Sequence, residues 1–153
     1  MRYLKAGDMV SGKKGKAIAT IDGNVEELFY LKDIEAIAEK QKNTVPVLGI
    51  SGDQSKTNGW SGTGSMTLYY VTSVFRKLML EYIKTGRDIY FDILIENADI
   101  SSRTGKQTVI LKEVNLDSIV MAKLDVNNTE LDEQTNFTWH DIDMPNEFDR
   151  LYE

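Results

Sequence analysis

The sequence predicts a mainly β protein with one flanking α-helix, and two observations predict this class. Apolar and polar residues alternate along several separate stretches, which is typical of strands with one buried face. A single stretch, at about 73–86, switches to helical spacing. Because helices do not alternate with the strands, a Rossmann-like or α/β-barrel fold is excluded. We expect the helix to lay its apolar stripe on the sheet and cover the core.

Size and composition narrow the class further. The 153 residues suit one domain, 1–153, that buries roughly 68–70% of its unfolded surface. The lack of cysteine excludes disulfides, thiolate metal sites and cysteine nucleophiles. A net charge of −6 argues against a protein that grips nucleic acid, but it is compatible with a surface past which DNA slides. Since neither a leader-like N-terminus nor a membrane-length apolar run occurs, we expect a soluble protein made in the cytoplasm, without a membrane anchor.

The first part of the chain predicts an arm followed by strands. Residues 1–16 are expected to form a flexible N-terminal arm, because 7–16 are polar and glycine-rich. The lysines of this arm lack the spacing of a phosphate-binding loop. Residues 17–21 read as a short strand, 22–24 as a hairpin-type turn, and 28–31 as a further apolar run.

Residues 32–42 fit either a strand or a helix. Alternation of apolar and polar positions favours a strand, whereas local propensity favours a helix; we choose the strand. Val45–Leu48 is expected to be another short strand. Because Pro46 lacks a backbone donor, that strand should lie at a sheet edge or begin there.

Residues 49–64 read as a long, polar, glycine-rich loop. Loops beyond about 12–15 residues in compact domains are usually functional or disordered. Trp60 is a large apolar residue within it, so it packs either on a partner or back on its own subunit, and the sequence leaves both open. We take as candidate contact residues with another molecule Gly52, Asp53, Lys56, Asn58 and Trp60.

The stretch from Gly62 to Gly86 changes from strand to helix. Its first half alternates like a strand around residues 65–70. Its second half carries one helical stripe, with Thr72 or Ser73 as the candidate N-cap and Gly86 beyond the C-terminus. The stripe consists of Phe75, Leu78, Met79, Tyr82 and Ile83.

The remaining chain predicts more strands. Residues 89–96 alternate most clearly, 97–106 form a polar loop, and 108–125 form one or two long strands. Residues 127–133 are expected to be a loop and 136–142 a final strand, followed by an acidic C-terminal tail at 144–153.

The search for catalytic or metal-binding residues yields no site. His140 is the one histidine, so any Ser-His-Asp site would need it, and an exposed or structural role is expected instead. Acidic residues at 130–133 and 141–143 suggest calcium, but Glu130 stands where an EF-hand loop requires glycine. We therefore expect no enzyme activity, no cofactor and no metal.

Several short pieces, in order and spacing, carry a resemblance. They are Ser11–Lys13, Tyr69–Phe75 after a glycine-rich run, Tyr82–Gly86, Val114–Ser118, Leu124–Val126, and Phe137–Thr138 with Asp141, Asp143 and Pro145. Together they resemble the tail-tube proteins of contractile phage tails, specifically the PBSX-like prophage family, over nearly the whole chain. Related tubes occur in phage-tail-like bacteriocins and type VI secretion systems. Residues 17–45 depart from the family pattern.

The resemblance implies a β-sandwich or barrel of the tail-tube type. It also implies hexameric rings that stack into a hollow tube inside a contractile sheath, with baseplate, tube-initiator and terminator proteins as further partners. It carries no catalytic residues. The protein would belong to a virion or phage-tail-like particle, as a conduit for DNA or effectors. Within such a tube we predict that residues 49–64 reach the next ring.

The alternating strand at 89–96 predicts which residues face the lumen. Since its apolar residues must face the core, Asp92 and Glu96 would face a channel wall on the opposite side. Glu35 and Glu39 join them if 32–42 is a strand. The alternative is that these carboxylates lie on the outer surface and confer solubility. The competing function is a monomeric binding module that uses the 49–64 loop as its recognition surface.

Overall fold

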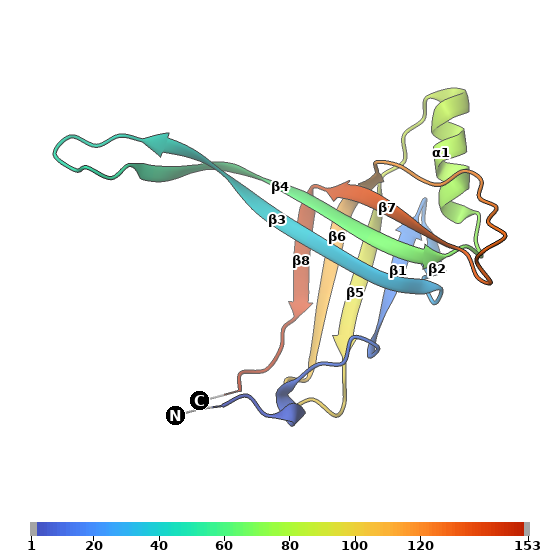
Figure 1. The fold of residues 1–153 in the computed structure, drawn as a ribbon, viewed down its shortest axis with the longest axis horizontal. Coiled ribbons are helices and arrows are strands. Elements are labelled where there is room, and N and C mark those ends of the chain that lie inside the picture. Colours follow the sequence, from blue (N-terminus) through green and yellow to red (C-terminus); the bar gives the residue numbers. More distant parts are fainter. Residues whose placement is uncertain (1–2, 152–153) are drawn as a thin grey trace.

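The structure, a computed structural model, describes residues 3–151 and consists mainly of strands (Figure 1). One helix, α1 (Val74–Thr85), and one 3₁₀ turn, η1 (Ala6–Asp8), accompany them. The strands are β1 (Gly15–Ile21), β2 (Asn24–Glu27), β3 (Leu31–Val45), β4 (Gln54–Tyr69), β5 (Phe91–Ala98), β6 (Lys106–Leu116), β7 (Asp132–Trp139) and β8 (Asp141–Asn146). The predicted class, mainly β with one flanking helix, is confirmed.

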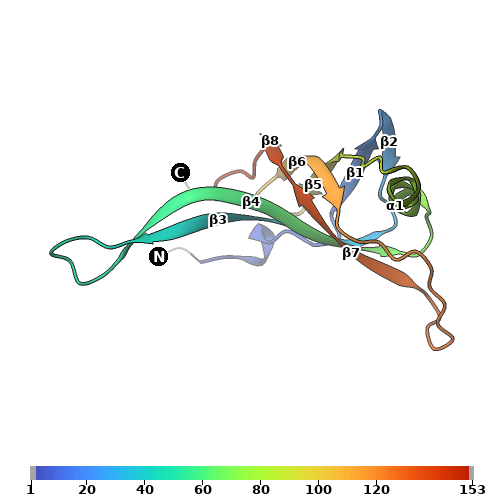
Figure 2. The same cartoon turned by 90° about the horizontal axis from the view of Figure 1, so that it is seen from above.

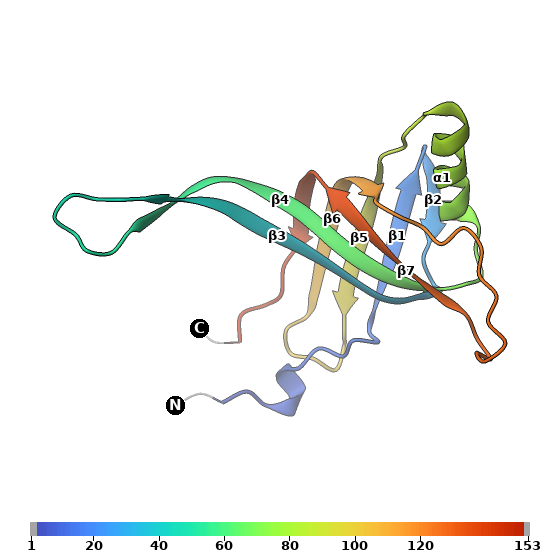
Figure 3. The ribbon, with the colours of Figure 1, turned by 45° about the horizontal axis from the view of Figure 1, so that its top comes forward.

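The strands form one antiparallel path that folds over into two layers. Their order is β2-β1-β5-β6-β7-β4-β3, and β8 pairs with β6 on the side. Strand β6 belongs to both layers, because its length pairs with β5 and β8 while its end at Asn115–Leu116 pairs with β7. We call β2, β1, β5, β6 and β8 the first sheet, and β7, β4 and β3 the second sheet. Figures 1 and 3 show the second sheet crossing in front of the first.

The core lies between the two sheets. On the first sheet, the register places Ala19 beside Ile93 and Ile93 beside Leu111, and all three are fully buried. Met66 and Phe137 face them from the second sheet and are equally buried. This arrangement leaves each sheet with one outer face that does not contribute to the core.

Helix α1 has the predicted ends, but only part of its stripe is buried. Ser73 is the N-cap residue and Gly86 ends the helix in the left-handed region, at φ 78°. Phe75 is 1% exposed and its ring lies 6.0 Å from that of Phe91. Tyr82 and Ile83, by contrast, are 50% and 59% exposed. The helix therefore packs by its first turns at one end of the sandwich, and the second half of the stripe remains open.

The largest correction concerns residues 45–64. The expected strand at Val45–Leu48 and the expected loop at 49–64 are both wrong, because β3 and β4 form one long hairpin whose turn is 46–53. The strand reading of 32–42 is confirmed. The sequence does not predict the distal part of β4 as a strand, because every residue from 35 to 58 is exposed and no alternation of apolar and polar residues marks it.

Packing against aromatic rings of β7 explains why two positions of β4 are glycine. A Cβ atom at Gly62 would lie 2.5 Å from the Trp139 ring, and one at Gly64 would lie 2.4 Å from Cζ of Phe137. The aromatic rings of β7 thus rest directly on the β4 backbone. Glycines that suggested a loop are instead sites of close approach between strands.

The structure corrects several other boundaries. The N-terminal arm ends before Gly15, and Ser11 donates its backbone N–H to Asp99 at 2.9 Å. Strand β8 takes the first residues, 144–146, of the expected acidic tail. Strand β6 stops at Leu116, so the expected strand residues at 117–125 lie in a loop, and His140 divides the expected final strand into β7 and β8. Residues 1–2 and 152–153 of the two terminal segments lie outside the described residues.

Candidate assembly surfaces

The β3–β4 hairpin extends well beyond the sandwich. Its register runs from Leu31↔Leu68 near the core to Val45↔Gln54 at the far end. The register shifts twice, between Leu31 and Asp33 near the core and between Gln41 and Lys42 farther out. At the second shift Gln41 pairs with Gly59 and the next pair is Lys42↔Thr57, so Asn58 is an extra, bulged residue. Figure 2 shows the far half reaching away from the rest of the molecule. Of the described chain, only the two strands themselves support this distal half.

The distal hairpin combines an apolar tip with basic flanks. Val45, Val47, Leu48 and Ile50 lie at the tip, and Leu48 is fully exposed. Residues 40–58 contain three lysines and a single aspartate, although the chain as a whole has a net charge of −6. Among residues 3–151, none of these three lysines forms an ion pair. A group of exposed aliphatic side chains is typical of a contact surface.

The candidate contact residues all lie on this hairpin, in two groups. Gly52 and Asp53 are in the turn, whereas Lys56, Asn58 and Trp60 are in β4. The Trp60 ring lies 5.3 Å from the ring of Trp139, yet Trp60 is still 48% exposed. Trp60 therefore packs on its own subunit and keeps half of its surface available.

The four lumen candidates divide between the two outer faces. Asp92 pairs with Thr20, and Glu96 pairs with Lys16, on the outer face of the first sheet. Glu35 and Glu39 pair with Ser65 and Ser61 on the outer face of the second sheet. Because these faces point in opposite directions across the core, only one pair can line a single channel wall.

The outer face of the second sheet is almost entirely polar. Its side chains come from alternate positions of β3, β4 and β7, as the register shows. Ile37 is the large apolar residue among them and is 48% exposed. The remaining positions are Asp33, Glu35, Glu39, Ser61, Thr63, Ser65, Thr67, Gln134, Asn136 and Thr138.

The outer face of the first sheet has a different character. Ile18, Leu94 and Ile110 pair across three strands and form a half-buried apolar row. Charges of both signs flank this row. Lys112, for example, donates to Asp143 at 2.7 Å, and this hydrogen bond raises the pKa of Lys112.

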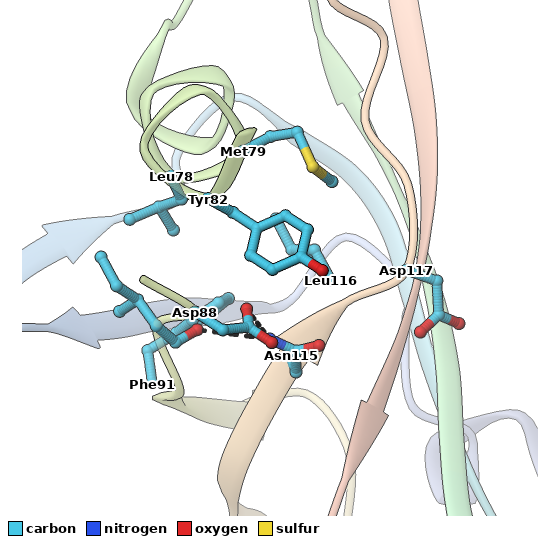
Figure 4. A pocket seen from close by; sticks show the side chains of 9 residues that line it. Leu78, Met79, Tyr82, Asp88, Phe91, Asn115, Leu116 and Asp117 are labelled. Atoms are coloured by element: carbon cyan, nitrogen blue, oxygen red, sulfur yellow. Dashed lines mark hydrogen bonds between the residues drawn. The ribbon is translucent and has the colours of Figure 1, made fainter. Parts of the chain in front are cut away.

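A pocket lies between α1 and the adjoining ends of β5 and β6 (Figure 4). Its volume is about 340 Å³. Leu78, Met79 and Tyr82 of α1 form one wall, and the carboxylates of Asp88 and Asp117 lie at the other side. The Asn115 side-chain amide donates to Asp88 Oδ1 at 2.7 Å, which fixes the position of that carboxylate. Sequence reasoning missed this site because its residues come from three separate segments.

The remaining candidates show no arrangement for catalysis. His140 is exposed, with Nδ1 3.2 Å from Glu113 Oε2 and its ring 5.9 Å from that of Tyr90. Among the described residues, no three acidic or histidine side chains come together as metal ligands. In the same part of the chain, α1 and η1 are both too short to cross a bilayer.

Comparisons with known proteins agree with this picture of a contact-bearing β-sandwich. The profile of a family described as "Phage tail tube protein" matches residues 2–146. The phage-like element PBSX protein XkdM of Bacillus subtilis (strain 168) is 42% identical over 142 residues, which cover 93% of this chain and 94% of that protein.

Solved structures share the fold. A chain in the sheath–tube complex of the PVC extracellular contractile injection system superposes with a TM-score of 0.67 and 10% sequence identity, and the match covers 91% of this chain and 93% of that chain. A chain in the PVC sheath/tube terminator structure gives a TM-score of 0.67 at 9% identity, with 93% of this chain and 100% of that chain covered. The SPP1 tail tube gives a TM-score of 0.62 at 12% identity, with 92% of this chain and 81% of that chain covered. At these identities the likeness concerns the fold.

Proposed function

This chain belongs to the phage tail tube family, and we propose that its copies assemble as hexameric rings that stack into the inner tube of a contractile phage tail or phage-tail-like particle. Residues 1–153 would act as a single tail-tube domain. The tube would be a conduit for DNA in a phage, or for effectors in a DNA-free, bacteriocin-like particle. The protein would be made in the bacterial host cytoplasm and become part of the particle.

The observation that carries this proposal is the long hairpin whose distal half meets no other element among residues 3–151. A two-stranded ribbon is marginal by itself in water. An exposed ribbon with an apolar tip is also an aggregation hazard unless a partner covers it. In a stack of rings, the next ring supplies that partner. We therefore retain an inter-ring role for this region, but assign it to the distal hairpin, 40–58, instead of 49–64, because residues 59–64 belong to the part of β4 that approaches the sandwich.

The outer face of the second sheet is the better candidate for the channel wall. Its serine, threonine, asparagine and glutamine side chains give DNA little to adhere to, and Glu35 and Glu39 repel phosphate. The first sheet then faces outward, toward the sheath. Its apolar row of Ile18, Leu94 and Ile110 suits a protein contact. Asp92 and Glu96 would belong to that outward surface.

Other partners follow from the same proposal. A tube of this kind ends at a baseplate or tube-initiator protein on one side and at a terminator on the other. Structures of a tube with its sheath and of a sheath/tube terminator share this fold, which supports these partner classes. At each end of the tube, the end protein would bind the same surface that otherwise contacts the next ring.

The decisive experiment is electron microscopy of the purified protein beside a hairpin-shortened variant. Replacing residues 42–58 by Asn-Gly keeps Gln41 opposite Gly59, since a two-residue turn of that type suits a hairpin. The wild type should form rings or tubes. The shortened chain should stay folded by circular dichroism but form no stacked tubes; normal tubes from it would refute the inter-ring role.

The alternative is a monomeric binding module that uses the hairpin as its recognition surface. Sedimentation of the wild type over a wide concentration range separates the two functions. A monomer at every concentration favours the binding module.

The channel assignment is tested by two matched double variants. Glu35→Lys with Glu39→Lys should leave tubes and sheath binding intact, and DNA should accumulate inside. Asp92→Lys with Glu96→Lys should instead weaken sheath binding. The opposite pattern would place the first sheet at the lumen.

We also propose that the tube protein has no catalytic role. His140→Ala should therefore leave assembly unchanged. A hydrolytic activity of the wild type that this variant lacks would show that the tube protein is also an enzyme.

A further inference from the structure

The pocket beside α1 combines an apolar wall with acidic residues. Its wall is apolar where Leu78, Met79 and Leu116 line it. Tyr82 at its edge is half-exposed, and Ile83, in the next position of α1, is exposed as well. These side chains leave apolar surface in contact with water. The free-energy cost of this exposure grows with the apolar area that remains uncovered.

The other side of the pocket is acidic. Asp88 is held in place by Asn115, and Asp117 is exposed at the end of β6. In the described part of the chain, neither carboxylate has a cationic partner. A ligand that carries positive charge beside its apolar part would satisfy both sides of the pocket.

The distal hairpin has this composition. Its tip presents the aliphatic residues Val47, Leu48 and Ile50, and its strands carry Lys40, Lys42 and Lys56. Lys42 lies six residues before Leu48, and Lys56, eight residues after it, lies opposite Asn43 on the partner strand. Insertion of the tip would bring these two lysines toward the acidic edge, whereas Lys40 lies farther back along the hairpin. Both apolar contact and charge therefore match between the two surfaces.

The two surfaces cannot meet within one chain. Figures 1 and 2 show the hairpin tip at one end of the long axis of the molecule and α1 at the other end. A contact between opposite ends of two copies is a head-to-tail contact, which generates rings or open filaments rather than a closed dimer. The positions of the surfaces thus agree with a repeating assembly.

We infer that the hairpin tip of one subunit, centred on Leu48, inserts into the pocket between α1 and the β5–β6 ends of a second subunit. This inference rests on the proposed function and names the receiving site that the hairpin uses. Leu48 fills the apolar part of the pocket, and the hairpin lysines face Asp88 and Asp117.

Disulfide crosslinking tests the contact directly, because the chain contains no cysteine. A Leu48→Cys chain and a Tyr82→Cys chain are mixed, assembled and oxidised. Both positions are at least half exposed, so the variants should fold. The expected product is a covalent dimer of one chain of each kind.

Ile100 provides the matched control. It is a fully exposed aliphatic residue like Leu48, but it lies in the turn between β5 and β6, which Figure 1 shows near the chain termini and away from α1. Ile100→Cys mixed with Tyr82→Cys should give no dimer. Equal crosslinking from Ile100→Cys and Leu48→Cys would mean random collision and would overturn the inference.

A charge at the tip gives a second readout. Leu48→Asp should raise the protein concentration needed for assembly on the order of tenfold or more, since a carboxylate would enter an apolar, acidic pocket. Ile100→Asp should leave that concentration unchanged. Assembly of Leu48→Asp at the wild-type concentration would overturn the inference.

The outcomes separate this inference from the function on which it rests. If the wild type forms tubes but the Leu48–Tyr82 crosslink is absent, the hairpin docks elsewhere and the tube function stands. If the wild type forms neither rings nor tubes, the proposed function fails and the inference fails with it.

Discussion

The two halves of strand β4 differ sharply in what stabilises them. In the proximal half, Met66 and Leu68 are fully buried, and aromatic rings of β7 rest on Gly62 and Gly64. In the distal half, the residues from 54 to 58 are exposed on both faces, and β3 is the neighbouring strand. The sandwich is therefore stabilised by its own core, whereas the distal hairpin has no core contact within the described residues and, in the proposed assembly, would be stabilised by a second copy.

The largest effect should follow from a change in the sandwich core. Phe75→Ala removes a buried ring between α1 and β5 and should lower the free energy of unfolding by roughly 3–5 kcal/mol. Tyr82→Ala, on the same helix but half-exposed, should lower it by less than about 1 kcal/mol. Denaturant unfolding measures both. Equal losses would contradict the partial burial of the helix stripe.

Glu133→Ala should come next. Its carboxylate is buried and pairs with Arg76, which also donates to the Val120 carbonyl at 3.3 Å and stacks 4.2 Å from the Tyr70 ring. Removing one partner leaves a partly buried cation, so the free energy of unfolding should fall by roughly 3 kcal/mol. Lys32 and Asp132 form the matched exposed pair, and Asp132→Ala should change it by less than about 1 kcal/mol.

Trp60→Ala probes the boundary between the two halves. The half-exposed ring contacts Trp139, whose Nε1 donates to the Thr63 carbonyl at 2.8 Å. Its loss should lower the free energy of unfolding by about 1–2 kcal/mol. Trp139 fluorescence should change at the same time. A change in assembly without any change in stability would mean that Trp60 acts only between subunits.

Acid should release the N-terminal segment before it affects the hairpin. Hydrogen bonds from the Ser101 hydroxyl and from the backbone N–H groups of Ser11 and Ser101 lower the pKa of Asp99 below its ordinary value of 3.8. A lowered pKa means that the stabilisation is complete above that ordinary value and is lost as the pH falls through the lower, folded value. The protection of the Ser11 amide against hydrogen exchange, relative to an unfolded peptide at the same pH, should therefore fall at low pH. In Asp99→Asn this protection should be low at every pH.

The smallest effect on stability should come from the hairpin tip. Leu48 is fully exposed, so Leu48→Ser should change the free energy of unfolding by no more than about 0.5 kcal/mol. Thermal unfolding of the unassembled chain measures this. A substantial loss would mean that the tip folds back on its own sandwich.

The contrast between the halves of β4 also explains what the sequence could reveal. Met66, Ile93 and Phe75 were recognised because burial imposes a period of two or of nearly four on apolar residues. The distal hairpin follows no such rule, since neither of its faces meets a core. Gly62 and Gly64 even suggested a loop, because only the structure shows the rings that exclude a Cβ atom.

The candidate surfaces were predictable to a smaller extent. The composition around Trp60 marks this segment as unusual, but it predicts a loop where the structure has strand β4. The division of Glu35 and Asp92 between opposite faces depends on pairing between distant strands, which alternation within one strand does not contain. The pocket beside α1 depends on the packing of three segments, which a single sequence does not specify.

The bulge at Asn58 gives the hairpin a mechanical property. At Gly62 and Gly64 the hairpin is held against the sandwich, because the rings of β7 pack directly on the β4 backbone there. Farther out, the extra residue Asn58 interrupts the hydrogen-bond ladder between β3 and β4 next to Gly59, so we expect the hairpin to bend most easily at that point. We therefore expect a load applied at the tip to bend the hairpin at Asn58 before it strains the core. In the proposed assembly, hairpins that bend at this point would let the tube flex along its length while each subunit keeps its shape.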